Sequence, residues 1–308
     1  MTLKIIFMGT PEFSVPILKS INESNHELLA VYTQSAKKKS RGQKLTKSPV
    51  HQFADKLKIP VRCPEDLDSE YEVNLIKDMQ PDIIIVVAYG KILPERLLVL
   101  SKIDFLNIHA SLLPKWRGAA PIQRAIMNMD DETGISIMKI VKKLDAGPVM
   151  KFLKVNIGKE TTYESLSKEM SILSAGLIVE CLNIIKNKKE KFIPQDNKKA
   201  TYAKKIDKSE AKINWKNKAK NIIASINALY PNPGSWFKLN GVRIKILKAK
   251  EIVAKGNPGE AINDKLLIAC AENAIQVLEV KKEGKSNMSA SSFLIGNKIK
   301  AGTNLNEV

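Results

Sequence analysis

Residues 81–90 read PDIIIVVAYG, a stretch in which five aliphatic residues run without interruption from Ile83 to Val87. A strand reads as a continuous apolar run of this kind when both of its faces are covered by other elements. Such strands are typical of parallel sheets that carry helices on both sides. The stretch therefore predicts a central strand of an α/β sheet.

The segments around this stretch alternate between strand and helix patterns. Short apolar runs predict strands over 3–9, 26–33, 102–110, 133–141 and 147–157, whereas helical spacing predicts helices over 15–24, 48–59, 120–129 and 162–187. Ser48 is placed to cap the second of these helices, with Pro49 at its first position. This alternation predicts a Rossmann-like, mostly parallel sheet.

The composition changes after Asn187, where the chain becomes polar, basic and poor in aliphatic residues. A helix pattern over 215–230 is followed by short strands, and Asn240-Gly241 is a strong hairpin signal between two of them. Several short strands at this spacing predict a small, OB-like β-barrel. A chain of 308 residues is also long for one core. We therefore expect an α/β domain over 1–188, a basic linker over 189–206 and a C-terminal β-barrel domain over 207–308.

The net charge of +18 is concentrated in two places. Residues 187–255 carry 18 Lys or Arg against 5 Asp or Glu, and residues 34–48 carry six basic residues and no acidic one. Such clusters indicate a polyanionic partner. The alternative is a solvated surface in a Lys-, Asn- and Ile-rich sequence.

Other features exclude several classes of protein. No segment approaches 18 uninterrupted apolar residues, so we expect no membrane span. Cys63, Cys181 and Cys270 are too scattered for a disulfide framework or a zinc knuckle, which favours reduced thiols and a cytoplasmic location. With only three histidines, no metal site is expected.

The predicted strand over 102–110 ends in two polar residues, Asn107 and His109. Side chains alternate along a strand, so these two project from the same face. The carboxyl end of a parallel strand is where open α/β sheets bind ligands. The alternative is a hydrogen-bonded core histidine beside a turn-forming asparagine.

Longer motifs around this pair resemble those of a known family. Nine stretches, which follow in order along nearly the whole chain, carry the likeness: 5–18 (IIFMGTPEFSVPIL), 41–50 (RGQKLTKSPV), 81–94 (PDIIIVVAYGKILP), 106–126 (LNIHASLLPKWRGAAPIQRAI), 132–138 (ETGISIM), 144–149 (LDAGPV), 200–215 (ATYAKKIDKSEAKINW), 231–234 (PNPG) and 283–296 (EGKSNMSASSFLIG). The chain resembles the methionyl-tRNA formyltransferases, within the formyltransferases that use 10-formyltetrahydrofolate.

The resemblance implies an enzyme that moves the formyl group of 10-formyltetrahydrofolate, a co-substrate, onto the α-amino group of methionine on initiator methionyl-tRNA, for translation initiation. It makes Asn107, His109 and Asp145 the catalytic residues. An uncharged amide of Asn107 suits the formyl oxygen as charge grows on it. His109 can donate to the same oxygen or move protons, and Asp145 would orient the imidazole. The folate contacts implied are Ser111, Leu112, Leu113 and Pro114 on one side and Val87, Ala88, Tyr89 and Gly90 on the other.

The resemblance also implies how tRNA is held. The basic loop would enter the acceptor-stem region, with Arg41 reading a base edge and Lys37, Lys38, Lys39 and Lys44 on phosphates. Lys204, Lys205 and Lys245 would face phosphates of the tRNA backbone below the acceptor end.

Departures from the family pattern are Lys142, Lys143 and Ala146 near Asp145, and Asn227 and Asn232 in the C-terminal region. We expect a monomer.

Two alternatives remain from the sequence. One is a formyltransferase that acts on a small amine, such as a sugar nucleotide or glycinamide ribonucleotide, which would not need the basic clusters. The other is a non-catalytic RNA-binding protein, which would explain the charge but not the intact set of amide, imidazole and carboxylate.

Overall fold

The computed structural model describes residues 2–39, 44–100 and 104–306. Its packing divides the chain into two compact units. The first unit comprises 1–118, 133–155 and 167–202, and the second comprises 119–132, 156–166 and 203–308. Two short segments of the N-terminal half thus belong to the second unit, and the domain limits expected from the sequence stay a prediction.

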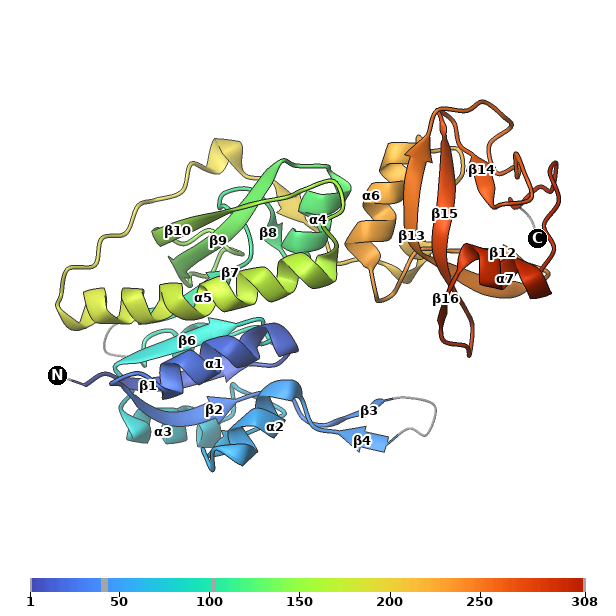
Figure 1. Ribbon diagram of the computed structural model, residues 1–308. Helices are drawn as coiled ribbons and strands as arrows, with labels where there is room; N and C mark the ends of the chain where they lie inside the picture. The colour runs from blue at the N-terminus through green and yellow to red at the C-terminus, as the bar shows by residue number, and fades with distance from the viewer. Residues whose placement is uncertain (1, 40–43, 101–103, 307–308) are drawn as a thin grey trace. The chain divides into compact units, whose positions relative to one another are not determined.

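The first unit is built on a seven-stranded sheet with the strand order β10-β9-β7-β6-β1-β2-β5 (Figure 1). The strands are β1 (Lys4–Gly9), β2 (Glu27–Tyr32), β5 (Val61–Arg62), β6 (Ile83–Val87), β7 (Asp104–His109), β9 (Glu132–Lys139) and β10 (Val149–Asn156). The pairs β1–β2, β1–β6, β2–β5 and β6–β7 are parallel, and β7–β9 is antiparallel. The predicted mostly parallel α/β sheet is confirmed.

Helices cover both faces of this sheet. They are α1 (Val15–Asn22), α2 (Pro49–Lys56), α3 (Glu70–Met79) and α5 (Tyr163–Lys186), the last of which begins in the second unit. The Ser48 hydroxyl accepts the His51 N–H at 3.0 Å, so the predicted cap of α2 is confirmed. The Ser171 hydroxyl on α5 donates to the Phe13 carbonyl at 2.6 Å, which ties α5 to the turn before α1.

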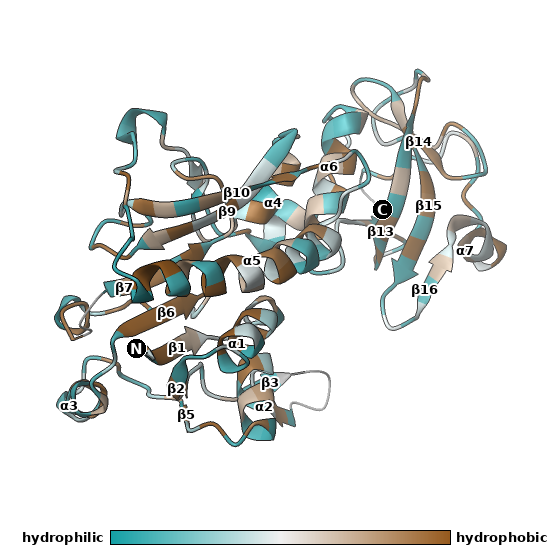
Figure 2. Ribbon diagram, turned by 60° about the vertical axis from the view of Figure 1, so that its left-hand side comes forward, coloured by the Kyte–Doolittle hydropathy of each residue, from teal (hydrophilic) through white to brown (hydrophobic). Residues whose placement is uncertain are grey.

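The interior of the first unit explains why its central strands carry no polar pattern. All five residues of β6 are buried, and β6 is brown along its length in Figure 2. One face of the sheet contributes Ile6, Ile84 and Phe105 to a cluster that also includes Ile76 of α3. Burying such side chains stabilises the fold by roughly 1.5–3 kcal/mol each.

The order of the strands places a switch point between β1 and β6. The chain runs from β1 outward to β2 and β5, and then returns to the other side of β1 as β6 and β7. Ligands of doubly wound sheets bind beyond the carboxyl ends of the strands at such a point. Here the carboxyl ends are Gly9 of β1 and Val87 of β6, which are register partners.

Shorter elements decorate the first unit. They are η1 (Glu12–Ser14), η2 (Glu95–Leu97), η3 (Asn197–Lys199), the hairpin strands β3 (Lys37–Lys39) and β4 (Lys44–Thr46), and β8 (Arg117–Gly118). The strand β11 (Tyr202–Ala203) lies where the chain passes from the first unit to the second. None of the helices in the described residues is long and apolar enough to cross a membrane.

The second unit carries an antiparallel sheet in which β12, β13, β15 and β14 are neighbours and β16 pairs with β15 (Figure 1). Its elements are α4 (Pro121–Met127), η4 (Lys208–Ala211), α6 (Ala219–Leu229), β12 (Trp236–Leu239), β13 (Val242–Ile252), β14 (Leu267–Ala269), β15 (Ala274–Lys282), β16 (Asn287–Ser289) and α7 (Ala290–Gly296). Asn240 and Gly241 join β12 to β13 with φ of 50° and 77°, as the primed hairpin turn requires. Trp215, Ile222 and Phe237 lie in its core.

Candidate active site

The end of β7 carries the first two predicted catalytic residues. Asn107 pairs with Val86 of β6 on one side and with Met138 of β9 on the other, whereas His109 pairs with Ser136 of β9. Strand alternation puts both side chains on one face of the sheet. Asn107 is half-buried, and within the described part of the chain its carboxamide has no hydrogen-bond partner. That amide is therefore available to a ligand.

Asp145 reaches His109 from a turn that follows β9. Its Oδ2 lies 3.7 Å from His109 Nδ1, and the two side chains are 14% and 7% exposed. The same oxygen accepts the Gly118 N–H at 2.8 Å. The Asp145 backbone has a φ of 44°, a left-handed conformation that costs energy in a non-glycine residue. The carboxylate is thus held close to the imidazole by a turn that other contacts must stabilise.

The other nitrogen of the His109 ring is engaged by the main chain. Nε2 lies 2.9 Å from the Trp116 carbonyl oxygen, which can only accept, so Nε2 carries the proton. Nδ1 therefore faces the Asp145 carboxylate either as a lone pair or, in the cationic ring, as an N–H. At 3.7 Å the gap is longer than a hydrogen bond. The arrangement suits an imidazole that gains a proton next to a carboxylate.

The segment after β7 turns sharply and is anchored to β9. Ser136 Oγ donates to the Ser111 carbonyl at 2.6 Å and accepts the Leu113 N–H at 3.1 Å. Ser111 Oγ donates to the Lys115 carbonyl at 2.6 Å. Ser111 and Leu113 are buried, so they shape the turn from inside, whereas Leu112 and Pro114 are half-buried. These four predicted folate contacts share one hydrogen-bonded turn that directly follows β7, the strand that carries Asn107 and His109.

The second predicted folate segment continues β6. Val87 and Tyr89 are buried, and Ala88 and Gly90 are exposed with φ of 46° and 79°. Polar side chains secure this loop: Ser14 Oγ donates to the Val87 carbonyl at 2.8 Å, while Thr10 Oγ1 and Gln34 Nε2 donate to the Tyr89 carbonyl at 2.8 and 3.0 Å.

The Tyr89 hydroxyl is buried without a partner among the described residues. A fixed loop with exposed backbone beside an apolar strand fits one face of a flat, polar ring such as a pterin. Val86, the residue just before this loop, pairs with Asn107. The loop therefore begins next to the residue whose amide has no hydrogen-bond partner in the described chain.

Part of the predicted tRNA contacts lies on the hairpin β3–β4. Lys37 and Lys38 on β3 and Lys44 on β4 are exposed, and Lys37 Nζ donates to Gln34 Oε1 at 2.5 Å. Lys39 pairs with Lys44 in the hairpin register. Arg41 lies outside the described residues. The structure therefore places basic side chains on both hairpin strands, and their contacts with tRNA stay a prediction.

The remaining predicted contacts lie in the second unit. Lys204 and Lys205 are exposed, and their carbonyls accept from Arg124 at 3.1 and 3.3 Å. Lys245 on β13 pairs with Lys281 on β15. Burial, and then the charges of Lys281 and Arg243, lower the Lys245 pKa. Like charges gathered on one sheet are stabilised by an anionic partner.

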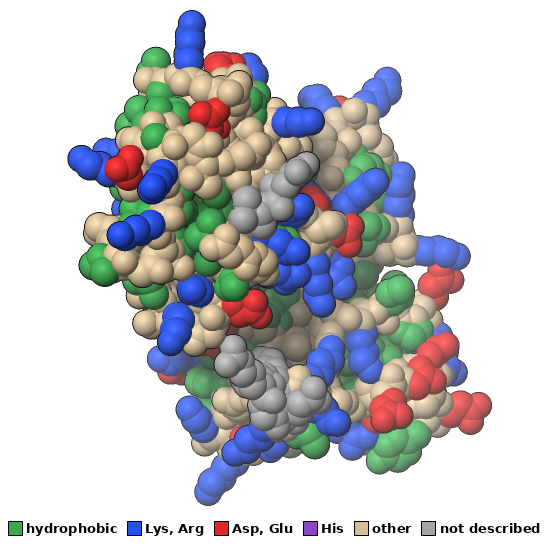
Figure 3. All heavy atoms as spheres, turned by 90° about the vertical axis from the view of Figure 1, so that its right-hand side faces the viewer, with side chains coloured by type: hydrophobic (Ala, Val, Ile, Leu, Met, Phe, Trp, Pro, Cys, Tyr) green, Lys and Arg blue, Asp and Glu red, His purple; other side chains and the backbone are tan. Residues whose placement is uncertain are grey.

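One face of the molecule is rich in basic side chains. On the face that Figure 3 shows, Lys and Arg side chains are widespread and Asp and Glu are fewer.

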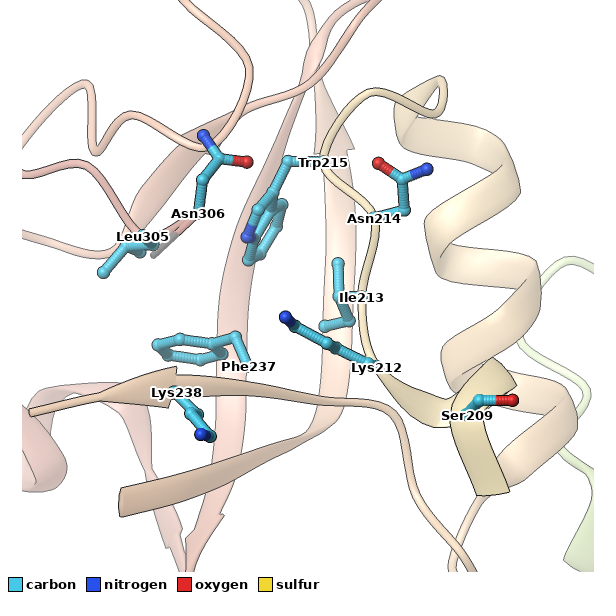
Figure 4. A pocket seen from close by; sticks show the side chains of 9 residues that line it. All are labelled: Ser209, Lys212, Ile213, Asn214, Trp215, Phe237, Lys238, Leu305 and Asn306. Carbon is cyan, nitrogen blue, oxygen red and sulfur yellow. The ribbon is translucent and has the colours of Figure 1, made fainter. Parts of the chain in front are cut away.

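The second unit has a cavity of about 430 Å³, whose walls include Trp215, Phe237 and Lys212 (Figure 4). The Trp215 Nε1–H is buried without a partner among the described residues. None of the residues predicted to touch tRNA lines this cavity.

Two site residues were not identified from the sequence. Arg117, which lies in the motif over 106–126 and to which the sequence assigned no role, is 1% exposed and binds Gln195 and Asn197 through its guanidinium. Gln195, which the sequence placed in a linker, donates to the Asp145 and Gly147 carbonyls at 2.9 and 2.7 Å. No local signal distinguishes Gln195, because its hydrogen-bond partners are 48 to 78 positions away in the sequence.

The departures from the family pattern lie mostly at the surface. Lys142 and Lys143 are exposed, and Lys142 Nζ lies 2.7 Å from Glu95 Oε1. The Ala146 N–H donates to the Lys143 carbonyl at 3.2 Å, which closes the turn that carries Asp145. In the second unit, the Asn227 amide donates to the Lys159 carbonyl at 3.2 Å. The described residues hold no cluster of three or more His, Cys, Asp and Glu that suits a metal ion.

Comparison with known proteins identifies the class. Residues 3–182 match the model of the formyl transferase family, and residues 205–298 match that of its C-terminal domain. The chain therefore belongs to the formyl transferases and is an enzyme of that family. This confirms the class inferred from the motifs.

Its relatives identify the branch. The chain is 46% identical over 310 residues to a methionyl-tRNA formyltransferase of Pelagibacter ubique (strain HTCC1062), with all of both chains covered. It is 41% identical to one of Chelativorans sp. (strain BNC1), over 99% of this chain and 100% of that one. The chain thus belongs to the methionyl-tRNA formyltransferase family, as the sequence resemblance predicted.

A solved structure shares the fold at lower identity. It is an N-formyltransferase from Helicobacter canadensis in complex with folinic acid and dTDP-3-aminofucose. The TM-score is 0.69 at 21% identity, over 92% of this chain and 100% of that one. The likeness shows that the two chains share an architecture.

Proposed function

We propose that this enzyme transfers the formyl group of 10-formyltetrahydrofolate to the α-amino group of methionine on initiator methionyl-tRNA. The observation that carries the proposal is the approach of Asp145 to His109 at the carboxyl end of β7, the strand that also carries the Asn107 amide, which has no hydrogen-bond partner among the described residues. The family match and the names of the relatives at 41–46% identity support the same reaction.

The reaction needs donors for an oxygen and a path for a proton. When the amine attacks the formyl carbon, negative charge develops on the formyl oxygen, and the Asn107 amide is free to donate to it. The attacking nitrogen must lose a proton, and the folate nitrogen must gain one as the carbon–nitrogen bond breaks. His109, with Nδ1 toward Asp145, is placed to hold that proton in transit.

The co-substrate would lie between the two anchored segments beyond the strand ends. Residues 87–90 offer exposed backbone at Ala88 and Gly90, and Leu112 and Pro114 offer half-buried apolar surface. We propose that the basic hairpin and the basic second unit bind tRNA. We also propose a cytoplasmic monomer, in keeping with three unpaired cysteines.

The direct test supplies the enzyme with 10-formyltetrahydrofolate and charged initiator tRNA and measures acid-stable formyl-methionine. Elongator methionyl-tRNA, an amino-sugar nucleotide and glycinamide ribonucleotide are the comparison substrates. Preferred formylation of the initiator tRNA is the expected outcome. Faster formylation of a small amine would favour the small-substrate alternative, and tRNA binding without any transfer would favour an RNA-binding protein.

A further inference from the structure

One amide side chain, that of Gln195, binds two carbonyls of the turn that carries Asp145. Gln195 Nε2 donates both to the Asp145 carbonyl at 2.9 Å and to the Gly147 carbonyl at 2.7 Å. Its Oε1 accepts from Arg117 Nε at 3.0 Å and Nη2 at 2.7 Å. The donor and acceptor groups of this amide are therefore all engaged, although Gln195 lies fifty positions from Asp145.

Arg117 completes a ring of contacts around the carboxylate. The backbone N–H of Arg117 donates to the Thr201 carbonyl at 2.9 Å, and the backbone N–H of the next residue, Gly118, donates to Asp145 Oδ2 at 2.8 Å. The Arg117-Gly118 segment thus fixes Asp145 in two ways. It binds the carboxylate directly, and it holds the Asp145 carbonyl through Gln195.

These contacts are hard to explain by stability alone. Arg117 is 1% exposed, its guanidinium donates to the neutral amides of Gln195 and Asn197, and its Nη1 is buried without a partner in the described chain. A buried charge without a carboxylate is costly to fold. The Asp145 backbone is also left-handed, which the surroundings must enforce. Both costs occur where the carboxylate meets His109.

We propose that Gln195, held by Arg117, is the positioning residue that fixes Asp145 against His109. This inference rests on the proposed function, because it concerns the same formyl transfer. Among the described residues, the hydrogen bonds of Gln195 join it to Arg117, Asp145 and Gly147 and not to the imidazole, so it acts through the Asp145 turn. Only an amide can serve here, because the side chain must accept from a guanidinium and donate to two carbonyls.

The test uses Gln195→Glu, which keeps an acceptor for Arg117 and so keeps the segment anchored, but loses the donors to the Asp145 turn. We expect kcat for formyl transfer to fall by about 10–100-fold, since small misplacements of catalytic groups cost this much. KM for folate and tRNA should change less than about threefold, because neither substrate is expected to contact Gln195.

The matched control is Asn197→Asp, which brings a new carboxylate to the same guanidinium. Within the described part of the chain, the Asn197 side chain makes no hydrogen bond to the Asp145 turn. This variant should keep kcat within about threefold of wild type. If both variants lower kcat equally, Gln195 and Asn197 merely anchor the Arg117-Gly118 segment, and the proposal is overturned.

A double-mutant cycle with Asp145→Asn tests the route of the effect. If Gln195 acts through Asp145, Gln195→Glu should lower kcat much less in the Asp145→Asn background than in wild type. Full additivity would overturn the proposal. A wild-type enzyme that transfers no formyl group would instead refute the proposed function, so the two failures are distinguishable. If Gln195→Glu lowers Tm, the cycle is repeated with Gln195→Met, which removes all four hydrogen bonds of the Gln195 side chain. The loss of kcat should again be much smaller in the Asp145→Asn background, and full additivity would again overturn the proposal.

Discussion

Val86 and Asn107 are register partners across the parallel ladder between β6 and β7. This pairing brings the loop over 87–90, which backbone and side-chain contacts hold rigid, beside the amide that has no partner in the described chain. A ring bound by that loop would therefore present a substituent to Asn107 without a large movement of either element.

Asn107→Ala should lower kcat for formyl transfer by about 10²–10³, the scale observed when one oxyanion donor is removed. Because the amide has no hydrogen bond to lose in the described chain, Tm should hardly change. Single-turnover rates with saturating substrates would measure the effect. Turnover within a few-fold of wild type would show that Asn107 has another role.

Asp145→Asn retains an oxygen that can accept the Gly118 N–H, so the turn should stay folded. It removes the negative charge 3.7 Å from His109 Nδ1. If the imidazole gains a proton during the reaction, kcat should fall by roughly 10²–10⁴, the range for general acid–base catalysis. The pH dependence of kcat, measured for both proteins, should change as well. An unchanged rate would place proton transfer elsewhere.

Much of this architecture follows from local patterns. The apolar run over 83–87 forms β6, the Ser48-Pro49 pair begins α2, and Asn240-Gly241 makes the hairpin of the second unit, because each depends on residues close in the sequence. The antiparallel pairing of β9 with β7 was not predicted, since pairing direction depends on how the chain returns to the sheet.

The site was predictable to a different extent. Asn107 and His109 lie two positions apart on one strand, and strand alternation alone places them on one face. The proximity of Asp145 came from the family motif. The part played by Arg117 and Gln195 did not follow from any motif, because their hydrogen bonds join segments brought together only by folding. Long-range polar contacts of this kind have no periodic signature.

Arg62→Met should destabilise the first unit. Glu72 is 6% exposed, and its two carboxylate oxygens are bound by Arg62 at 2.5 Å and by the Tyr32 hydroxyl at 3.2 Å. Losing the guanidinium would leave a buried carboxylate with one partner, which costs about 1–3 kcal/mol. Urea unfolding measures the loss. Adding Glu72→Gln should restore part of it, and a double variant less stable than Arg62→Met would contradict this explanation.

His26 should make the stability of the fold depend on pH. It is 8% exposed, its Nδ1 accepts the Leu3 N–H at 3.4 Å, and burial, followed by the charge of Lys186, lowers its pKa below 6.5. Between the lowered folded-state pKa and 6.5, the unfolded chain binds more protons, so the free energy of unfolding rises with pH in this window. The stabilisation is complete above 6.5 and is lost as the pH falls.

The check on His26 is the difference in Tm between pH 7.5 and pH 5.5. His26→Gln should reduce this difference because the substitute does not titrate. His51→Gln is the matched comparison: burial, and then the charge of Lys47, lower the His51 pKa against the opposing charge of Asp55. The His51 side chain is 17% exposed, whereas His26 is 8% exposed, so the effect of His51→Gln should be smaller. An acid-induced loss of Tm that is the same in wild type and His26→Gln would contradict the assignment.

Lys245→Gln should weaken tRNA binding and reduce its dependence on salt. Lys245 lies opposite Lys281. Burial, and then the charges of Lys281 and Arg243, lower the Lys245 pKa, and these like charges repel one another in the free protein. A tRNA phosphate would relieve the repulsion and release counterions. Loss of one phosphate contact should therefore reduce the slope of log K against log salt by about 1.

Lys218→Gln is the control for this prediction, because Lys218 Nζ already lies 2.6 Å from Glu272 Oε2 and its charge is compensated. Filter binding over a range of salt concentrations would compare the two variants. If both change the slope equally, the effect is one of net charge, and Lys245 makes no particular contact with the phosphate backbone.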